Sequence, residues 1–133
     1  MNQLNAWVLV IGRIMMAVIF VAAGAGKLAN FEATQGYMQS MGVPGVLLPL
    51  VVLTELGGGL SILLGYKVRI TSLLLAGFCL VSGAIFHHNF ADQAQVIMFM
   101  KNLAMAGGFL MFFVSGAGPI SLDAKLAQVP NDV

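Results

Sequence analysis

Four long apolar runs fill most of this chain and constrain its fold more than any other feature. They lie at residues 6–24, 46–64, 70–86 and 96–114. A membrane-spanning helix needs about 20 largely apolar residues, with a range of roughly 17–25, and each run has that length. Because unpaired backbone N–H and C=O groups are too costly in lipid, each run must be helical. The sequence therefore predicts an all-α, polytopic membrane protein built as a bundle of four transmembrane helices.

The composition excludes a soluble domain. The 133 residues are 59% hydrophobic and 8% charged, whereas soluble domains carry roughly 25% charged residues. The formal net charge of +1 gives no basis for binding nucleic acid. Cys79 is the single cysteine, so the chain forms neither an internal disulfide nor a CxxC pair. We expect one membrane domain covering residues 1–133, surrounded by the lipid bilayer.

The distribution of basic residues predicts the orientation. Residues 65–69 are so short a link that the second and third spans must form an antiparallel hairpin. Lys67 and Arg69 make this the most basic loop, and Lys125 lies on the same side in the polar tail of residues 115–133. The opposite side has Lys27 and Lys101. The positive-inside rule then places both termini in the cytoplasm.

The connection at residues 25–45 is longer than the other loops. Within it, apolar side chains from Phe31 to Met41 recur at helical spacing, opposite Glu32, Gln35 and Gln39. This pattern predicts a short amphipathic helix at the outer interface, between the first and second transmembrane helices. The sequence Gly-Val-Pro at residues 42–44 is expected to end it.

Three of the apolar runs contain a charged residue. Arg13 lies in the first run, Glu55 in the second and Lys101 in the fourth. A charge near the centre of a span costs roughly 2.5–3.5 kcal/mol, so we expect these side chains to face each other or a cavity. We predict that Glu55 is ionised and paired with Arg13 or Lys101, since an unpaired buried carboxylate would be protonated instead. Such a pair either fixes the helix register or serves a function.

Helical spacing and topology together predict a polar interior. Arg13 and Lys27 share a face of the first helix, and the predicted orientation gathers further polar side chains in the outer half. Glu55 is the candidate catalytic residue, as a proton relay, and the candidate ligand-binding residues are Arg13, Lys27, His87, Lys101 and Asn102. The ring of a ligand would lie among Phe20, Phe86 and Phe109.

Simpler interpretations of the same residues stay open. The two lysines, Lys27 and Lys101, would then only extend to lipid headgroups. His87 keeps a functional interpretation, as a proton carrier or as a hydrogen-bond partner of a quinone. His87 and His88 point roughly 100° apart on a helix and cannot easily bind one metal ion, so no metal site is predicted.

Several short motifs, each weak alone, follow one another in a particular order across the four spans. They are Arg13, FVAAG at 20–24, GKL at 26–28, Phe31, Tyr37, GVP at 42–44, EL at 55–56, LG at 64–65, Arg69, Asn102 and GAGPISLD at 116–123. In this order the chain resembles the DoxX family of small bacterial inner-membrane proteins over nearly its whole length. The resemblance implies a four-helix membrane bundle with polar family positions at Arg13, Lys27, Glu55, Arg69 and Asn102. Some relatives are named as subunits of a quinone-linked oxidoreductase acting on thiosulfate, and others are linked to thiol or oxidative-stress defence.

These observations lead to a functional hypothesis and two alternatives. The protein is expected to be an accessory subunit of a quinone- or thiol-linked redox system, without a covalent cofactor. It would bind quinone between its helices and serve a soluble or membrane-bound redox partner. The alternatives are a binding or transport protein for a small lipophilic or anionic molecule, and a purely structural partner subunit. Whether the chain itself is catalytic stays open. We also expect a homo-oligomer, because four spans are few for a transporter.

Overall fold

The computed structural model describes residues 1–128, and within them all regular structure is helical. The elements in chain order are α1 (Gln3–Ala29), α2 (Phe31–Ser40), the 3-10 turn η1 (Gly45–Leu47), α3 (Leu48–Leu64), α4 (Val68–Phe86), α5 (Gln93–Ser115) and α6 (Leu122–Ala127). Four of these segments are long and apolar enough to cross a membrane: α1, α4, α5 and the continuous stretch from η1 through α3. The predicted all-α, four-span membrane protein is therefore confirmed.

The helices extend beyond the apolar runs by a few residues because polar caps prolong them. Asn2 accepts a hydrogen bond from the backbone N–H of Asn5 at 2.8 Å and so starts α1 ahead of the apolar run. Asp92 does the same for α5 through the N–H of Ala94 at 3.0 Å. At its other end α1 continues to Ala29, which brings Lys27 into its last turn. The apolar run thus marks the part of a helix that lies in lipid rather than the whole helix.

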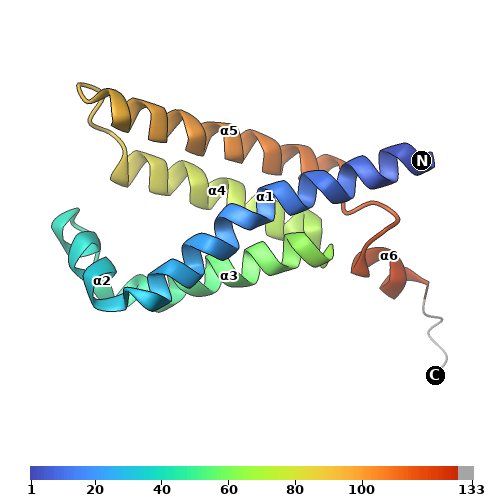
Figure 1. The fold of residues 1–133 in the computed structure, drawn as a ribbon, viewed down its shortest axis with the longest axis horizontal. Helices are drawn as coiled ribbons and strands as arrows, with labels where there is room; N and C mark the ends of the chain where they lie inside the picture. The colour runs from blue at the N-terminus through green and yellow to red at the C-terminus, as the bar shows by residue number, and fades with distance from the viewer. Residues whose placement is uncertain (129–133) are drawn as a thin grey trace.

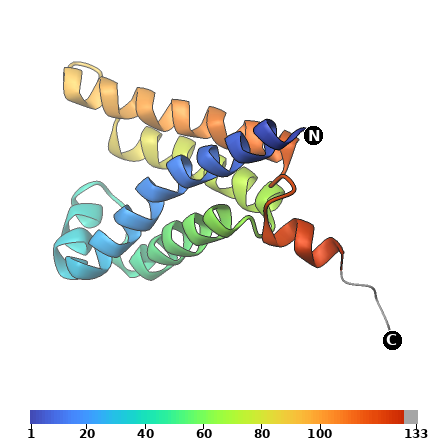
Figure 2. The same ribbon diagram turned by 45° about the vertical axis from the view of Figure 1, so that its right-hand side comes forward.

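The four long helices are arranged as two pairs, α1 with α3 and α4 with α5. Figures 1 and 2 show the pairs close together near the α3–α4 hairpin and apart at the end that carries α2. Where the pairs meet, their side chains form one buried core that includes Ile62, Leu75 and Phe109. The bundle is consequently closed at the hairpin end and splayed at the other.

A glycine sets the close approach of α1 and α3. A Cβ atom on Gly59 would lie 2.9 Å from a methyl group of Val21 and 3.1 Å from the Val21 backbone nitrogen. Small residues at such crossings allow helix backbones to approach closely in membranes. This contact fixes the axial register of the two antiparallel helices.

The α2 helix confirms the predicted amphipathic segment. It buries Met38 against Leu48 and Val52 of α3, and Tyr37 stacks on Phe86 of α4 with ring centroids 5.6 Å apart. Gly42, with φ of 79°, lies just beyond its end. By these contacts α2 covers the side of the splayed end where α3 and α4 face each other.

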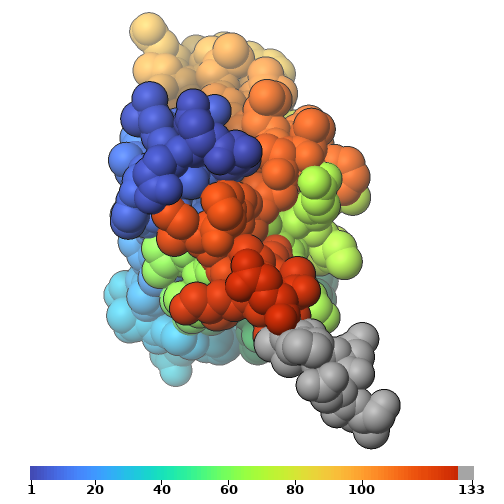
Figure 3. All heavy atoms as spheres, turned by 90° about the vertical axis from the view of Figure 1, so that its right-hand side faces the viewer, coloured from blue at the N-terminus to red at the C-terminus, as the bar shows by residue number. Residues whose placement is uncertain are grey.

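The segment after α5, which begins the predicted polar tail, is bound to the hairpin between α3 and α4. The Asp123 carboxylate accepts hydrogen bonds from the backbone N–H groups of Lys67 and Val68, at 2.7 and 3.0 Å. The Asp123 N–H donates to the Gly65 carbonyl at 2.9 Å. Figure 3 shows this segment, orange to red, against the green hairpin. The contact has a physical reason: the hairpin exposes free N–H groups at the start of α4, and a carboxylate satisfies them. Residues 129–133 of the predicted tail lie outside the described residues.

Candidate functional site

The centre of the candidate site is an ion pair between α1 and α3. Lys27 Nζ lies 2.9 Å from both carboxylate oxygens of Glu55. The side chains of Lys27 and Glu55 are 29% and 7% exposed. The prediction that Glu55 pairs with a basic side chain is confirmed, but the predicted partners, Arg13 and Lys101, are wrong.

Arg13 is not part of this site because it lies at the other end of α1. At 1.5 Å per residue it is about 21 Å from Lys27 along the helix. Its side chain is 2% exposed, packs against Gly65 and donates through Nη2 to the Ile120 carbonyl at 2.6 Å. Arg13 therefore holds the segment after α5 on the hairpin.

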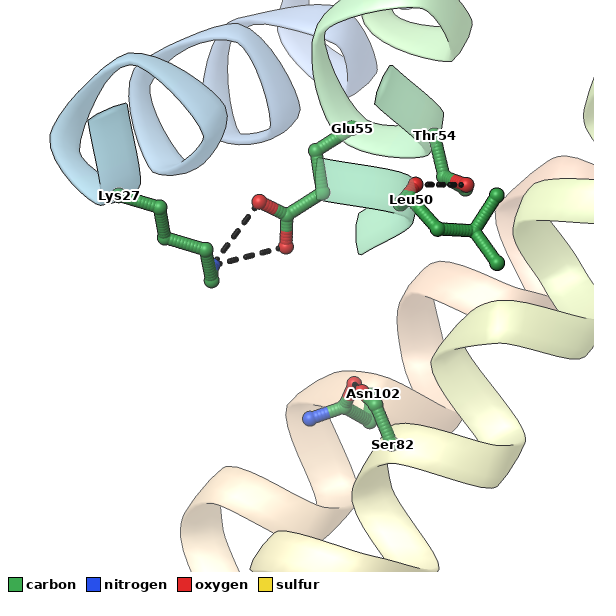
Figure 4. Close-up of polar contacts among 6 residues, drawn as sticks. All are labelled: Lys27, Leu50, Thr54, Glu55, Ser82 and Asn102. Carbon is green, nitrogen blue, oxygen red and sulfur yellow. Dashed lines mark hydrogen bonds and ion pairs between the residues drawn. The ribbon is translucent and has the colours of Figure 1, made fainter. Parts of the chain in front are cut away.

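A cavity of about 380 Å³ lies beside the ion pair, between the two helix pairs. Figure 4 shows Lys27 and Glu55 on one side of an open space, with Ser82 and Asn102 on the other. The wall is mostly apolar, and its polar or ionisable side chains are Lys27, Thr34, Tyr37, Glu55, Cys79, Ser82, His87 and Asn102. Of the predicted site residues, the structure thus brings together Lys27, Glu55, His87 and Asn102.

Lys101 is absent from the cavity wall and exposed on the outer face of α5. Its neighbour Asn102 faces α4, where its side chain approaches Gly83. Successive residues on a helix point about 100° apart, so Asn102 and Lys101 cannot both face inward. The prediction of Lys101 as a ligand-binding residue is not supported by this geometry.

The polar groups opposite the ion pair are partly engaged with one another. Asn102 Nδ2 donates to the Met98 carbonyl at 3.0 Å, and the Ser82 hydroxyl donates weakly to Asn102 Oδ1 at 3.4 Å. His87 Nδ1 lies 3.1 Å from Gln95 Oε1. Since an amide nitrogen carries two N–H groups, Asn102 keeps one donor for another partner.

Aromatic rings form a large part of the apolar wall. Phe20, Phe78 and Phe86 line the cavity, with Phe20 edge-on to Phe78 at 6.4 Å between ring centroids. Phe109 was predicted to line a ring site together with Phe20 and Phe86. It is instead fully buried behind Phe20, 5.2 Å away.

Sequence reasoning missed some members of the wall. Ser82 lies three residues after Cys79 and four before Phe86, so helical spacing places it on the same face of α4 as these two wall residues. Thr34 and Tyr37 come from α2, and only the folding of α2 over the splayed end brings them to the cavity. No cluster of three or more His, Cys, Asp or Glu side chains able to hold a metal ion occurs in residues 1–128.

The fold and the site define a four-helix membrane protein with a largely apolar cavity between its helices and an ion pair in the cavity wall. Residues 8–88 match the DoxX family model. The chain is 47% identical over 126 residues to the inner membrane protein YqjF of Escherichia coli K12, covering 95% of this chain and 97% of that protein. It is 34% identical over 124 residues to the inner membrane protein YphA of the same organism, covering 88% and 89%. No solved structure matches. The chain therefore belongs to the DoxX family of inner-membrane proteins.

Proposed function

We propose that the cavity beside Lys27 and Glu55 binds a quinone from the bilayer, and that the protein is an accessory subunit of a quinone- or thiol-linked redox system. The observation that carries the proposal is the charge balance of the cavity wall. One lysine faces one glutamate at 2.9 Å, and the other lining side chains are apolar, neutral polar or imidazole. Such a wall favours a neutral ligand with a few polar atoms.

The same balance argues against an anion as the ligand. An anionic substrate was suggested by the excess of cations in the apolar runs, but Arg13 and Lys101 do not line the cavity. The remaining cation, Lys27, already contacts both Glu55 oxygens. An anion near Lys27 would also be repelled by the Glu55 carboxylate beside it, so the ion pair offers an anion no net positive charge.

Size and shape support a ring compound. Cavities that hold small molecules have volumes of about 300–1,000 Å³ and mostly apolar walls with a few polar groups, and this cavity has about 380 Å³. Phe20, Phe78 and Phe86 supply aromatic surfaces for a flat ring. Ile19 and Val81 also line the cavity while being 49% and 60% exposed on the lipid-facing surface. The isoprenoid chain of a bound quinone would extend from the cavity into the lipid past Ile19 and Val81.

The polar residues of the wall would have distinct roles. Lys27 has a third N–H besides the two directed at Glu55, and Asn102 has one free N–H, so both are donors for a carbonyl oxygen. Reduction of a quinone to a quinol requires protons as well as electrons, and the wall includes a carboxylate, Glu55, and an imidazole, His87, which are groups that serve as general acids and bases. The proton would pass through Glu55 rather than stay on it, because the charged form of Glu55 pairs with Lys27.

The source of electrons in this proposal is a redox partner. The chain has one cysteine, and a thiol–disulfide couple of its own would need two. The partner, soluble or in the membrane, and the homo-oligomer expected from the sequence are parts of the proposal. Cross-linking in native membranes followed by purification would identify both.

We also propose that both termini lie in the cytoplasm. Lys67, Arg69 and Lys125 all lie at the hairpin end of the bundle, whereas Lys27 at the splayed end is paired with Glu55. The positive-inside rule then places the hairpin in the cytoplasm and the cavity in the outer half of the membrane. A cysteine-accessibility scan on intact cells and inside-out vesicles tests this orientation.

The ligand proposal is tested by binding a short-chain ubiquinone and a short-chain menaquinone to the purified protein in detergent. We expect saturable binding that Glu55→Gln and Lys27→Gln weaken about tenfold each, because each loses a charge-assisted contact. The matched controls are Glu32→Gln and Lys101→Gln, which make the same changes at exposed residues outside the wall. Equal binding by all four variants, or no saturable binding by the unaltered protein, would contradict the proposal.

A further inference from the structure

A second concave site lies at the opposite end of the bundle from the quinone cavity. It is a groove of about 470 Å³ between the start of α4 and the segment that follows α5. Its lining residues are Lys67, Arg69, Ile70, Ser115, Gly116, Ala117, Gly118, Asp123 and Ala124. We infer that this groove binds the headgroup of an anionic phospholipid. The inference does not depend on the proposed quinone site.

The charged side chains of the groove favour an anion. Two cations, Lys67 and Arg69, face one acid, Asp123. Both Asp123 oxygens already accept backbone N–H groups, those of Lys67 and Val68, at 2.7 and 3.0 Å. Within residues 1–128 neither Lys67 nor Arg69 forms a salt bridge with a carboxylate. The groove thus has a surplus of positive charge and free N–H donors.

The Arg69 guanidinium is held in place before any ligand arrives. Its Nη1 donates to the Phe113 carbonyl at the end of α5, at 2.9 Å. A Cβ atom on Gly116 would lie 3.3 Å from Arg69 Nε, so the glycine backbone packs directly against the guanidinium. Gly116 has a φ of 72°, which favours glycine there. Such prior positioning lowers the entropic cost of binding a phosphate group.

The position of the groove relative to the membrane indicates a lipid rather than a soluble phosphate. The α4 helix begins at Val68 and α5 ends at Ser115, so the groove lies where the spans reach the headgroup region. Its wall includes Ile70, which is 64% exposed, and Ser115, whose neighbour in the chain, Val114, is 68% exposed. A lipid bound there would place its phosphate near Arg69 and its acyl chains along these apolar side chains. Basic pockets between transmembrane helices bind anionic lipid headgroups in this way.

The test uses delipidated full-length protein in detergent and measures bound lipid by native mass spectrometry and stabilisation by thermal unfolding. Phosphatidylglycerol is compared with phosphatidylethanolamine, which is zwitterionic, and with inorganic phosphate. The variants are Lys67→Gln and Arg69→Gln. Lys125→Gln is the matched control, because Lys125 lies nearby in α6 and does not line the groove.

We expect phosphatidylglycerol to bind and stabilise the protein, and each groove variant to weaken this binding about fivefold. Lys125→Gln and inorganic phosphate should have little effect. Arg69→Gln could fail to fold because it loses the contact with Phe113, and in that case Lys67→Gln decides. The Lys67 ammonium lies 5.5 Å from the centroid of the Tyr66 ring and forms no salt bridge within residues 1–128, so its loss should not prevent folding. Unchanged binding in Lys67→Gln, an equal loss in Lys125→Gln, or full competition by inorganic phosphate would each overturn the inference.

Discussion

Lys27 and Glu55 join α1 to α3 through a two-oxygen ion pair, with the ammonium nitrogen 2.9 Å from each carboxylate oxygen. The pair lies in the splayed half of the bundle, where the helix pairs leave a cavity. It therefore stabilises the α1–α3 pair and also forms the charged part of the cavity wall. The two roles can be separated by experiment.

If the ion pair stabilises the α1–α3 pair, the effects of changing Lys27 and Glu55 on the free energy of unfolding should be coupled. Lys27→Met leaves the Glu55 carboxylate, 7% exposed, without its cation and should destabilise the protein by about 1–3 kcal/mol. Glu55→Gln should cost less, because Lys27 is 29% exposed and its long side chain can reach the headgroup region. The double variant should be less destabilised than the sum of the single changes. Denaturant unfolding in mixed micelles measures all three, and strictly additive effects would show that the pair contributes no coupling energy.

Two nearby glycines of α3, Gly57 and Gly59, predict a difference in stability that depends on packing alone. Gly59→Ala should destabilise the bundle by about 1–3 kcal/mol, because the new methyl group meets Val21 of α1 at 2.9 Å. Gly57→Ala is the matched control, since the nearest atom to its Cβ, on Leu53, is 3.9 Å away. Alanine is the better helix former, so Gly57→Ala should be neutral or slightly stabilising. Thermal unfolding in detergent distinguishes the two, and equal midpoints would contradict the close α1–α3 contact.

The buried arginine predicts a local effect at the hairpin end. Arg13→Gln removes the contact with the Ile120 carbonyl and should loosen the segment from Gly116 to Ala127. Hydrogen exchange in that segment should increase, while exchange in α2 stays as it was. Asp123→Asn, which weakens the hydrogen bonds to the start of α4, should have a similar effect. Unaltered exchange after α5 in both variants would show that these residues do not hold the segment.

The cavity predicts a specific role for the amide in α5. Asn102→Leu removes the free N–H opposite Lys27 but fills a similar volume, so quinone affinity should fall by roughly tenfold, as expected for one hydrogen bond at about 1.4 kcal/mol. Equilibrium binding of a short-chain ubiquinone measures the change. Leu103→Ala is a suitable comparison, because Leu103 is next in the chain but 46% exposed and outside the cavity wall. If Leu103→Ala lowers the affinity as much as Asn102→Leu, the amide is not a ligand.

The spans, the hairpin and α2 could be predicted because each depends on local sequence: hydropathy, loop length and helical spacing. The partner of Glu55 could not be predicted from local sequence, because it depends on the axial register of α1 against α3. That register is set by contacts such as Gly59 with Val21 and Gly24 with Leu56, which bring the last turn of α1 beside Glu55. Lys27 lies beyond the apolar run, so hydropathy assigned it to the membrane edge. Helical spacing placed Arg13 and Lys27 on one face of the first helix, but it could not show that Arg13 lies against the hairpin and the segment after α5.

The most direct test of the central claim is to locate the bound quinone within the protein. A short-chain ubiquinone carrying a photoreactive azide would be cross-linked in reconstituted membranes, and the labelled residues identified by mass spectrometry. Binding in the cavity predicts labels on lining residues such as Phe20, Tyr37 and Asn102, abolished by excess unlabelled quinone and reduced in Glu55→Gln. Labels spread over lipid-facing residues such as Leu74 and Met111, insensitive to competition, would contradict it.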